Sequence, residues 1–131
     1  LERWRRIATE AAEQSGRSRA PMIGTPVSLA DIASSAPAPL FVAHEAVRAE
    51  TLIRAVPPNA RALSVIIGPE GGLAESEVER LVQHDSAVAV SLGPRILRAE
   101  TAAITAVTLT LAATENLAPA RERAWQEIRD R

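Results

Sequence analysis

Three short segments of the chain are apolar on both faces, and each is followed by a segment of helical character. The apolar segments are Leu40–Ala43, 62–67 and 87–91. A strand that is apolar on both faces has to be covered on both sides, which is typical of a parallel sheet with helices on each face. The 131 residues, 47% of them hydrophobic, suffice for one compact domain. The sequence therefore predicts a single α/β domain with a parallel sheet flanked by helices.

The helices are predicted from apolar residues that recur at helical spacing. This pattern gives a first helix, Glu2–Gln14, with one apolar face, and Gly16 ends it. A helix over 100–114 is apolar on nearly every side, so we expect burial on every side, by the core or by a second subunit. Between prolines, residues 22–23 could form a short strand. Further helices are predicted over residues 28–34, 46–55 and 75–84.

Composition excludes several kinds of site. The chain has no cysteine, which removes disulfides, thiolate nucleophiles and the common zinc sites, and its two histidines, His44 and His84, cannot form a metal site alone. We therefore expect no metal. The net charge is −1, and all 15 basic residues are arginine. Arginines gather near the amino end and at Arg95 and Arg98, which is compatible with an RNA partner and equally with solvated surface.

Neither a leader sequence nor a membrane span is predicted. Residues 1–6 are charged, and no apolar core follows them. The longest apolar run, 101–113, is interrupted by threonines and is shorter than the roughly 20 residues that cross a bilayer. We expect a cytoplasmic protein that does not bind membranes. Because the chain does not begin with methionine, we also expect a segment to precede it.

Two loops that leave the carboxyl ends of predicted strands are the candidates for chemistry, because ligands of open parallel sheets bind at those ends. The glycines of the first, GPEGG at 68–72, indicate either a tight turn or a ligand that approaches the backbone closely. Its spacing fits no phosphate-binding motif, and Glu75 and Glu77 at the start of the next helix would repel a phosphate. A nucleoside cofactor without phosphate, carrying a positive sulfonium, remains compatible with these acids.

The second loop, LGPRILR at 92–98, places apolar side chains around Gly93. Leu92, Ile96 and Leu97 could simply anchor the loop to the core. They could also form the walls of an adenine pocket in which backbone groups bind the edge of the base. His44 and Glu45, which end the first strand, could line the same pocket or serve the structure alone.

GPEGG at 68–72, SLGPRILRAETA at 91–102 and EAAEQSGRSRAP at 10–21 together closely resemble the three signature segments of the 16S ribosomal RNA uridine N3-methyltransferases, a family of the SPOUT superfamily. The resemblance extends to about residue 116. It implies a Rossmann-like sheet whose C-terminal portion is threaded into a deep trefoil knot. It further implies a homodimer that binds S-adenosylmethionine in a bent form and methylates N3 of a uridine in the 16S RNA of the small ribosomal subunit.

The chain departs from the family pattern in three places. Residues 1–117 correspond to the catalytic domain, whereas 118–131 form a charged tail beyond the family's usual end. The family's small N-terminal β-barrel for RNA binding is missing, so we expect the isolated domain to bind the cofactor but to methylate ribosomal RNA poorly. The family usually has Ser where Ala74 stands, and Ser76 with Glu79 could form a shifted capping box instead.

Residue roles follow from this resemblance and from the chemistry of methyl transfer. Removal of the N3 proton calls for a base, and the anion that remains calls for a nearby cation. Glu70 or Glu100 could be the base, or could only hold an arginine in place, while Arg98 or Arg17 could be the cation. We expect Arg17, Arg19 and Arg95 to contact RNA. The residues expected to bind the cofactor, mostly through backbone groups, are Ile67, Gly68, Gly72, Leu92, Gly93, Ile96, Leu97 and Arg98.

Two other classes of function are alternatives to a methyltransferase. A non-catalytic module for dimerisation or RNA docking could keep the fold without the chemistry, but the intact signature loops argue against it. A nucleotide-dependent oxidoreductase or kinase would need a glycine motif and a phosphate-binding lysine, and the sequence has neither. A measurement of S-adenosylmethionine binding distinguishes the enzyme, which should bind it, from the non-catalytic module, which should not.

Overall fold

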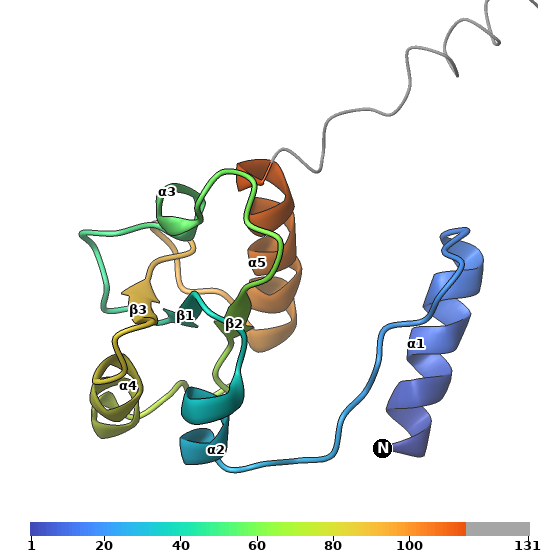
Figure 1. The fold of residues 1–131 in the computed structure, drawn as a ribbon, viewed down its shortest axis with the longest axis horizontal. Coiled ribbons are helices and arrows are strands. Elements are labelled where there is room, and N and C mark those ends of the chain that lie inside the picture. Colours follow the sequence, from blue (N-terminus) through green and yellow to red (C-terminus); the bar gives the residue numbers. More distant parts are fainter. Residues whose placement is uncertain (115–131) are drawn as a thin grey trace, which may run out of the picture.

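The computed structural model describes residues 1–114, so the predicted tail, 118–131, lies outside the described residues. The described part alternates helices and strands, as the sequence predicts (Figure 1). In chain order the elements are α1 (Glu2–Gln14), α2 (Leu29–Ser35), β1 (Leu40–Ala43), α3 (Leu52–Ala55), β2 (Ser64–Ile66), α4 (Glu75–Val82), β3 (Ala87–Val90) and α5 (Ala99–Ala113).

The three strands form one parallel sheet in the order β2-β1-β3. Leu40 at the start of β1 pairs with Ser64 on one side and with Ala87 on the other. β1 is thus the central strand, and its first three residues are buried almost completely, at 1% exposure or less. The prediction of a parallel sheet flanked by helices is confirmed, but burial on both faces holds for β1 alone, because the residues of β2 are half-buried and Val88 of β3 is 42% exposed.

Helices cover both faces of the sheet (Figure 1). Phe41 points to the face covered by α3 and α5, and Val42 points to the face covered by α2 and α4. Each face therefore has its own apolar cluster, and β1 contributes to both. The buried members are Phe41, Leu52, Val56, Val90 and Ala106 on the first face and Ala33, Val42, Val78 and Leu81 on the second.

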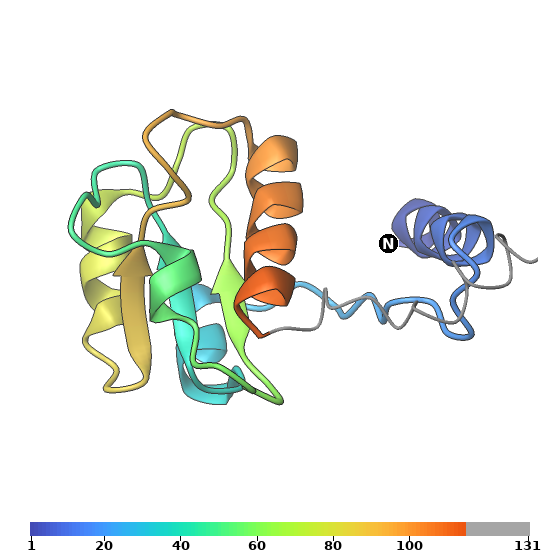
Figure 2. The ribbon, with the colours of Figure 1, turned by 90° about the horizontal axis from the view of Figure 1, so that it is seen from above.

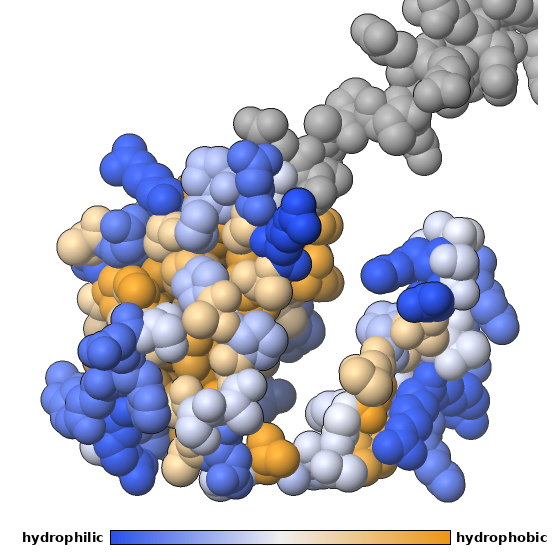
Figure 3. Space-filling view, in the orientation of Figure 1, coloured by the Kyte–Doolittle hydropathy of each residue, from blue (hydrophilic) through white to orange (hydrophobic). Residues whose placement is uncertain are grey.

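Helix α1 stands apart from the sheet and its covering helices in both ribbon views (Figures 1 and 2). It ends as predicted at Gly16, which adopts a φ of +68°. Residues 17–28 then run without helix or strand to α2. Figure 3 shows apolar residues on the side of this part of the chain that faces the domain, and the two large apolar side chains of α1, Trp4 and Ile7, are 66% and 49% exposed.

Two predicted elements differ in the structure. The helix predicted over 46–55 is limited to Leu52–Ala55, because Thr51 pairs in parallel with Ser91 and holds its neighbours in extended conformation. Residues 22–23 form no strand. They lie in the segment that leads away from α1, where no neighbouring strand is available for pairing.

The alternative that the core alone buries the last helix on every side is wrong, whereas its burial by a second subunit stays a prediction. Ala102 and Ala106 of α5 are buried against the core, whereas Ile104 and Val107 on its outer side are 69% and 61% exposed. The small side chains of Ala102 and Ala106 let α5 approach the sheet closely, and Leu109 packs partly buried against the same core. No helix within residues 1–114 is long and apolar enough to cross a lipid bilayer.

Candidate functional site

The loops that follow the three strands meet at one end of the sheet and enclose a cavity. Figure 2 shows the loop after β2 and the loop after β3, in yellow-green and orange, at this end. The loop after β1 and the first turns of α5 complete the lining. Parallel strands place their carboxyl ends at the same edge, so the sheet itself brings these loops together.

The first loop folds back on itself directly after β2. A Cβ atom on Gly68 would lie 3.0 Å from the backbone nitrogen of Leu73 and 3.1 Å from the carbonyl carbon of Gly72. At such distances a side chain would push the loop's own backbone aside by a few tenths of an ångström, so the close approach favours glycine there. The amide of Gly72 donates to the carbonyl of Pro69 at 2.9 Å, and Gly72 adopts a φ of +75°. The glycines thus build a tight turn that forms one wall of the cavity.

The second loop is held by Ser91, the residue after β3. Its Oγ accepts from the amide of Gly93 at 3.1 Å and donates to the carbonyl of the same residue at 3.0 Å. Gly93 adopts a φ of +139°, which side-chain-bearing residues rarely occupy. Within residues 1–114, the backbone groups of 95–97 make no hydrogen bond. The second loop therefore has unpaired backbone donors and acceptors at 95–97, next to a turn that the hydrogen bonds of Ser91 hold in place.

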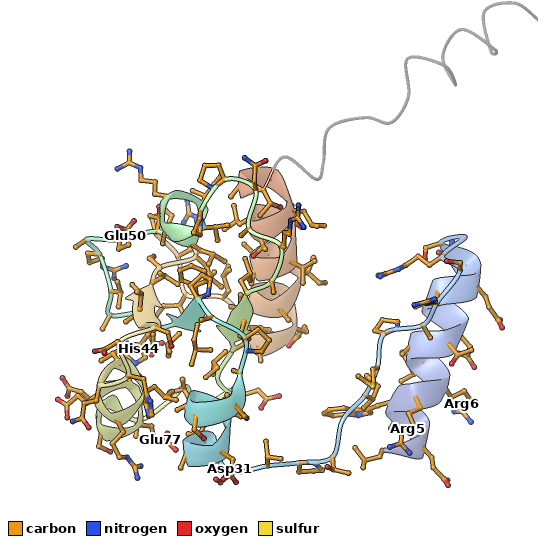
Figure 4. All side chains as sticks on the ribbon, viewed as in Figure 1. Arg5, Arg6, Asp31, His44, Glu50 and Glu77 are labelled. Atoms are coloured by element: carbon orange, nitrogen blue, oxygen red, sulfur yellow. The ribbon has the colours of Figure 1, made fainter. Side chains whose placement is uncertain are left out.

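His44 and Glu45 form a third wall at the end of β1 (Figure 4). The amide of His44 donates to the carbonyl of Val90, which continues the pairing with β3 beyond the last strand residue. The His44 Nδ1 accepts from the amide of Ala46 at 3.4 Å. The carboxylate of Glu45 extends to the first loop and lies beside Gly72. The alternative that these residues line the pocket is the one that the structure supports.

Charged groups of both signs reach the cavity. Glu45 and Glu70 are acidic, and Arg95 is basic. In the described part of the chain, none of these three side chains takes part in an ion pair or a hydrogen bond. Their charges are therefore available to a ligand. Among residues 1–114, no group of three histidine, aspartate or glutamate side chains could hold a metal ion.

The structure brings together most of the residues that the sequence indicates. Seven of the eight residues expected to bind the cofactor line the cavity, together with Glu70 and Arg95. Arg98 is the N-cap residue of α5, and Glu100 lies in its first turn; neither lines the cavity. Arg17 and Arg19 lie in the segment after α1, also outside the lining (Figure 1). The roles of these four residues stay predictions. The seven in the lining are Ile67, Gly68, Gly72, Leu92, Gly93, Ile96 and Leu97.

Ser91 is a residue of this site that the sequence pattern does not single out, because the apolar run makes it the last residue of a strand. Its burial and its hydrogen bonds to Gly93 make it part of the loop. A serine two residues before a loop glycine is a signal that could have indicated a side-chain-to-backbone turn. The sequence offers Glu45 as a possible pocket residue, but nothing in its local sequence indicates that it reaches the first loop.

Residues 1–111 match the family model of the RNA methyltransferase domain. Ribosomal RNA small subunit methyltransferase E from Bacillus subtilis is 40% identical over 124 residues, which are 88% of this chain and 48% of the relative. The enzyme of the same name from Rickettsia conorii is 35% identical, over 82% of this chain and 45% of the relative. The chain thus spans about half the length of these curated relatives.

Solved structures agree with the sequence relatives. A Legionella pneumophila protein solved in complex with S-adenosylmethionine superposes with a TM-score of 0.75 at 38% identity, over 86% of this chain and 46% of that one. Ribosomal RNA small subunit methyltransferase E from Neisseria gonorrhoeae, bound to S-adenosylmethionine, gives a TM-score of 0.71 at 32% identity, over 89% of this chain and 47% of that one.

Proposed function

Because this chain belongs to the RNA methyltransferase domain family, we propose that its cavity binds S-adenosylmethionine and that the domain methylates N3 of a uridine in 16S ribosomal RNA. The observation that carries this proposal is the cavity itself, where both signature loops meet at the carboxyl edge of the sheet. The relatives named ribosomal RNA small subunit methyltransferase E support the RNA substrate. The choice of uridine N3 rests on the resemblance of the signature segments alone.

The residues of the cavity fit each part of such a cofactor. The adenine ring suits the apolar side chains of the second loop, among which Ile96 is 81% exposed and gains burial from a flat apolar partner. The unpaired backbone groups of 95–97 offer hydrogen bonds to the edge of the base. Glu45 and Glu70 favour the positive sulfonium and ammonium groups, and Arg95 could hold the carboxylate.

When bound, the cofactor supplies an electrophilic methyl group to N3 of the uracil. The protein has to remove the N3 proton, whose acidity is similar to that of a phenol with a pKa of about 10. Glu70, in the cavity lining, or Glu100, near the start of α5, accepts this proton or orients an arginine. Arg98 or Arg17 stabilises the negative charge that spreads over the uracil oxygens. Holding N3 in line with the methyl group supplies most of the acceleration.

We also propose that the domain forms a homodimer and that its chain is knotted. The exposed outer side of α5 supports a homodimer, because it carries Ile104, Val107 and Leu111 close together on one helix. The deep trefoil knot and the cytoplasmic location follow from the family resemblance. We propose both on that basis.

RNA contacts are assigned to arginines that lie outside the core. Arg17 and Arg19 are exposed on the segment after α1, and Arg95 is exposed at the rim of the cavity. Few contacts give weak binding to a polyanion, because the affinity rises with the number of phosphates neutralised. This chain alone should therefore methylate ribosomal RNA slowly. The portion that the relatives have in addition supplies further contacts and orients the target base.

Two measurements test the proposed function. Calorimetry with S-adenosylmethionine should show one site per chain; absence of binding would favour the non-catalytic module. Transfer of a labelled methyl group to undermethylated small ribosomal subunits, followed by mapping of the modified base, tests substrate and atom. The full-length Bacillus subtilis relative is the reference, and equal rates for both proteins at subsaturating substrate would contradict the expected weakness of this chain.

A further inference from the structure

Ser91 connects three segments that surround the cavity. Its backbone amide donates to the carbonyl of Glu50 at 2.9 Å, and its carbonyl accepts from the amide of Leu52 at 3.0 Å. These two bonds attach the end of β3 to the segment that follows the wall formed by His44 and Glu45. The side chain of Ser91 then bonds both polar backbone groups of Gly93. At 6% exposure, Ser91 is buried, although its bonds to Gly93 lie at the edge of the cavity.

The two side-chain hydrogen bonds of Ser91 depend on the residue type, whereas its two backbone hydrogen bonds do not. Any residue at position 91 could make the backbone bonds to Glu50 and Leu52. The hydroxyl of Ser91 donates and accepts at once, so it satisfies the carbonyl and the amide of Gly93 together, which an apolar side chain could not do. Gly93 has an unusual φ of +139° and, without a side chain, many alternative conformations. The hydroxyl selects one of them.

We infer that Ser91 is a positioning residue, whose hydroxyl holds the loop 92–97 in the conformation that receives the cofactor before the cofactor arrives. This inference rests on the proposed function, since it assumes that the cavity binds S-adenosylmethionine. Because Gly93 is satisfied by Ser91, the loop backbone that is left to bind the ligand lies at 95–97. A loop ordered in advance loses less conformational entropy on binding.

The test uses three variants of the whole protein. Ser91→Ala removes the hydroxyl, Ser91→Thr retains it, and Ser86→Ala is the matched control at the opposite, exposed end of β3. The first readout is hydrogen exchange of the Gly93 amide, followed by NMR; the chain has only six glycines, which simplifies assignment. The second is the Kd for S-adenosylmethionine. Thermal unfolding of each variant shows whether the fold is retained.

Ser91→Ala should accelerate exchange of the Gly93 amide by about tenfold or more and raise the Kd about three- to tenfold, as expected for the loss of one or two hydrogen bonds. Ser91→Thr should restore slow exchange, and Ser86→Ala should change neither quantity. Unchanged exchange in Ser91→Ala, or faster exchange with an unchanged Kd, would overturn the inference. If the unsubstituted protein bound no cofactor, the proposed function would fall, while the exchange rates would still decide whether Ser91 holds the loop.

Discussion

The carboxylate of Glu45 lies beside Gly72, so that a Cβ atom on residue 72 would be 3.4 Å from Oε1 of Glu45. The contact joins the loop after β1 to the loop after β2 across the cavity. It places a negative charge next to a turn where no side chain intervenes. An acid in this position, without a partner in the described part of the chain, has a clear electrostatic preference for a cationic ligand.

Glu45→Gln should therefore weaken binding of S-adenosylmethionine more than binding of S-adenosylhomocysteine. Both molecules have the ammonium group, but only the first has a positive sulfur. Because Glu45 is exposed and water screens its charge, the expected rise in the Kd for S-adenosylmethionine is about two- to fivefold. Calorimetry with both ligands measures the difference.

The matched control is Glu79→Gln on α4, an exposed acid that does not line the cavity. It should leave both affinities unchanged. An equal loss of affinity for the two ligands in Glu45→Gln would show that the Glu45 carboxylate does not interact with the sulfonium.

Gly68→Ala should lower both the stability and the cofactor affinity, whereas Gly71→Ala should be nearly neutral. The added methyl group at 68 would lie 3.0–3.1 Å from the backbone of Leu73 and Gly72 and 3.2 Å from the Leu73 side chain, so the loop has to shift. Overpacking of this kind costs about 1–3 kcal/mol. At Gly71 the same methyl group meets nothing within 4 Å, and the backbone is not left-handed. Thermal unfolding measures the stability of both variants, and calorimetry measures their affinity for the cofactor. Equal stabilities and affinities for the two variants would contradict the prediction.

Much of the framework could be predicted because its signals are local. Apolar strands such as Leu40–Ala43 and the glycine that ends α1 are determined by neighbouring residues, and the sheet then brings their loops to one edge. For this reason the first and second loops could be placed at one cavity from the sequence.

Features that depend on distant contacts could not be predicted. The helix expected over 46–55 loses its first half because Thr51 pairs with Ser91, forty residues away. The capping box expected at Ser76 and Glu79 is also wrong. Instead, Ala74 is the N-cap residue of α4, and its amide donates to the Glu77 carboxylate at 2.8 Å. The path of the backbone before α4 thus decides that Glu77, and not Glu79, caps the helix.

Val107→Glu should shift the proposed homodimer towards monomer. Val107 is 61% exposed on the outer side of α5 in the single chain, so a charge there leaves the monomer intact but would be buried in the dimer. The dimer dissociation constant should rise at least about tenfold, as is common for central interface positions. Light scattering over a concentration series measures it. Val82→Glu, an exposed apolar position on α4, is the control; a monomeric unsubstituted protein at all concentrations would refute the dimer.

Arg95→Gln decides whether this arginine serves the RNA or the cofactor. Arg95 lines the cavity and is exposed, so it could bind an RNA phosphate or the cofactor's carboxylate. If it neutralises one phosphate, its loss lowers the slope of log affinity for RNA against log salt concentration by about one and leaves the Kd for S-adenosylmethionine unchanged. That is the expected result. Arg61→Gln, at an exposed position before β2 and thus at the opposite edge of the sheet, should change neither quantity. A weaker cofactor affinity with an unchanged salt slope would instead assign Arg95 to the carboxylate and remove it from the RNA contacts.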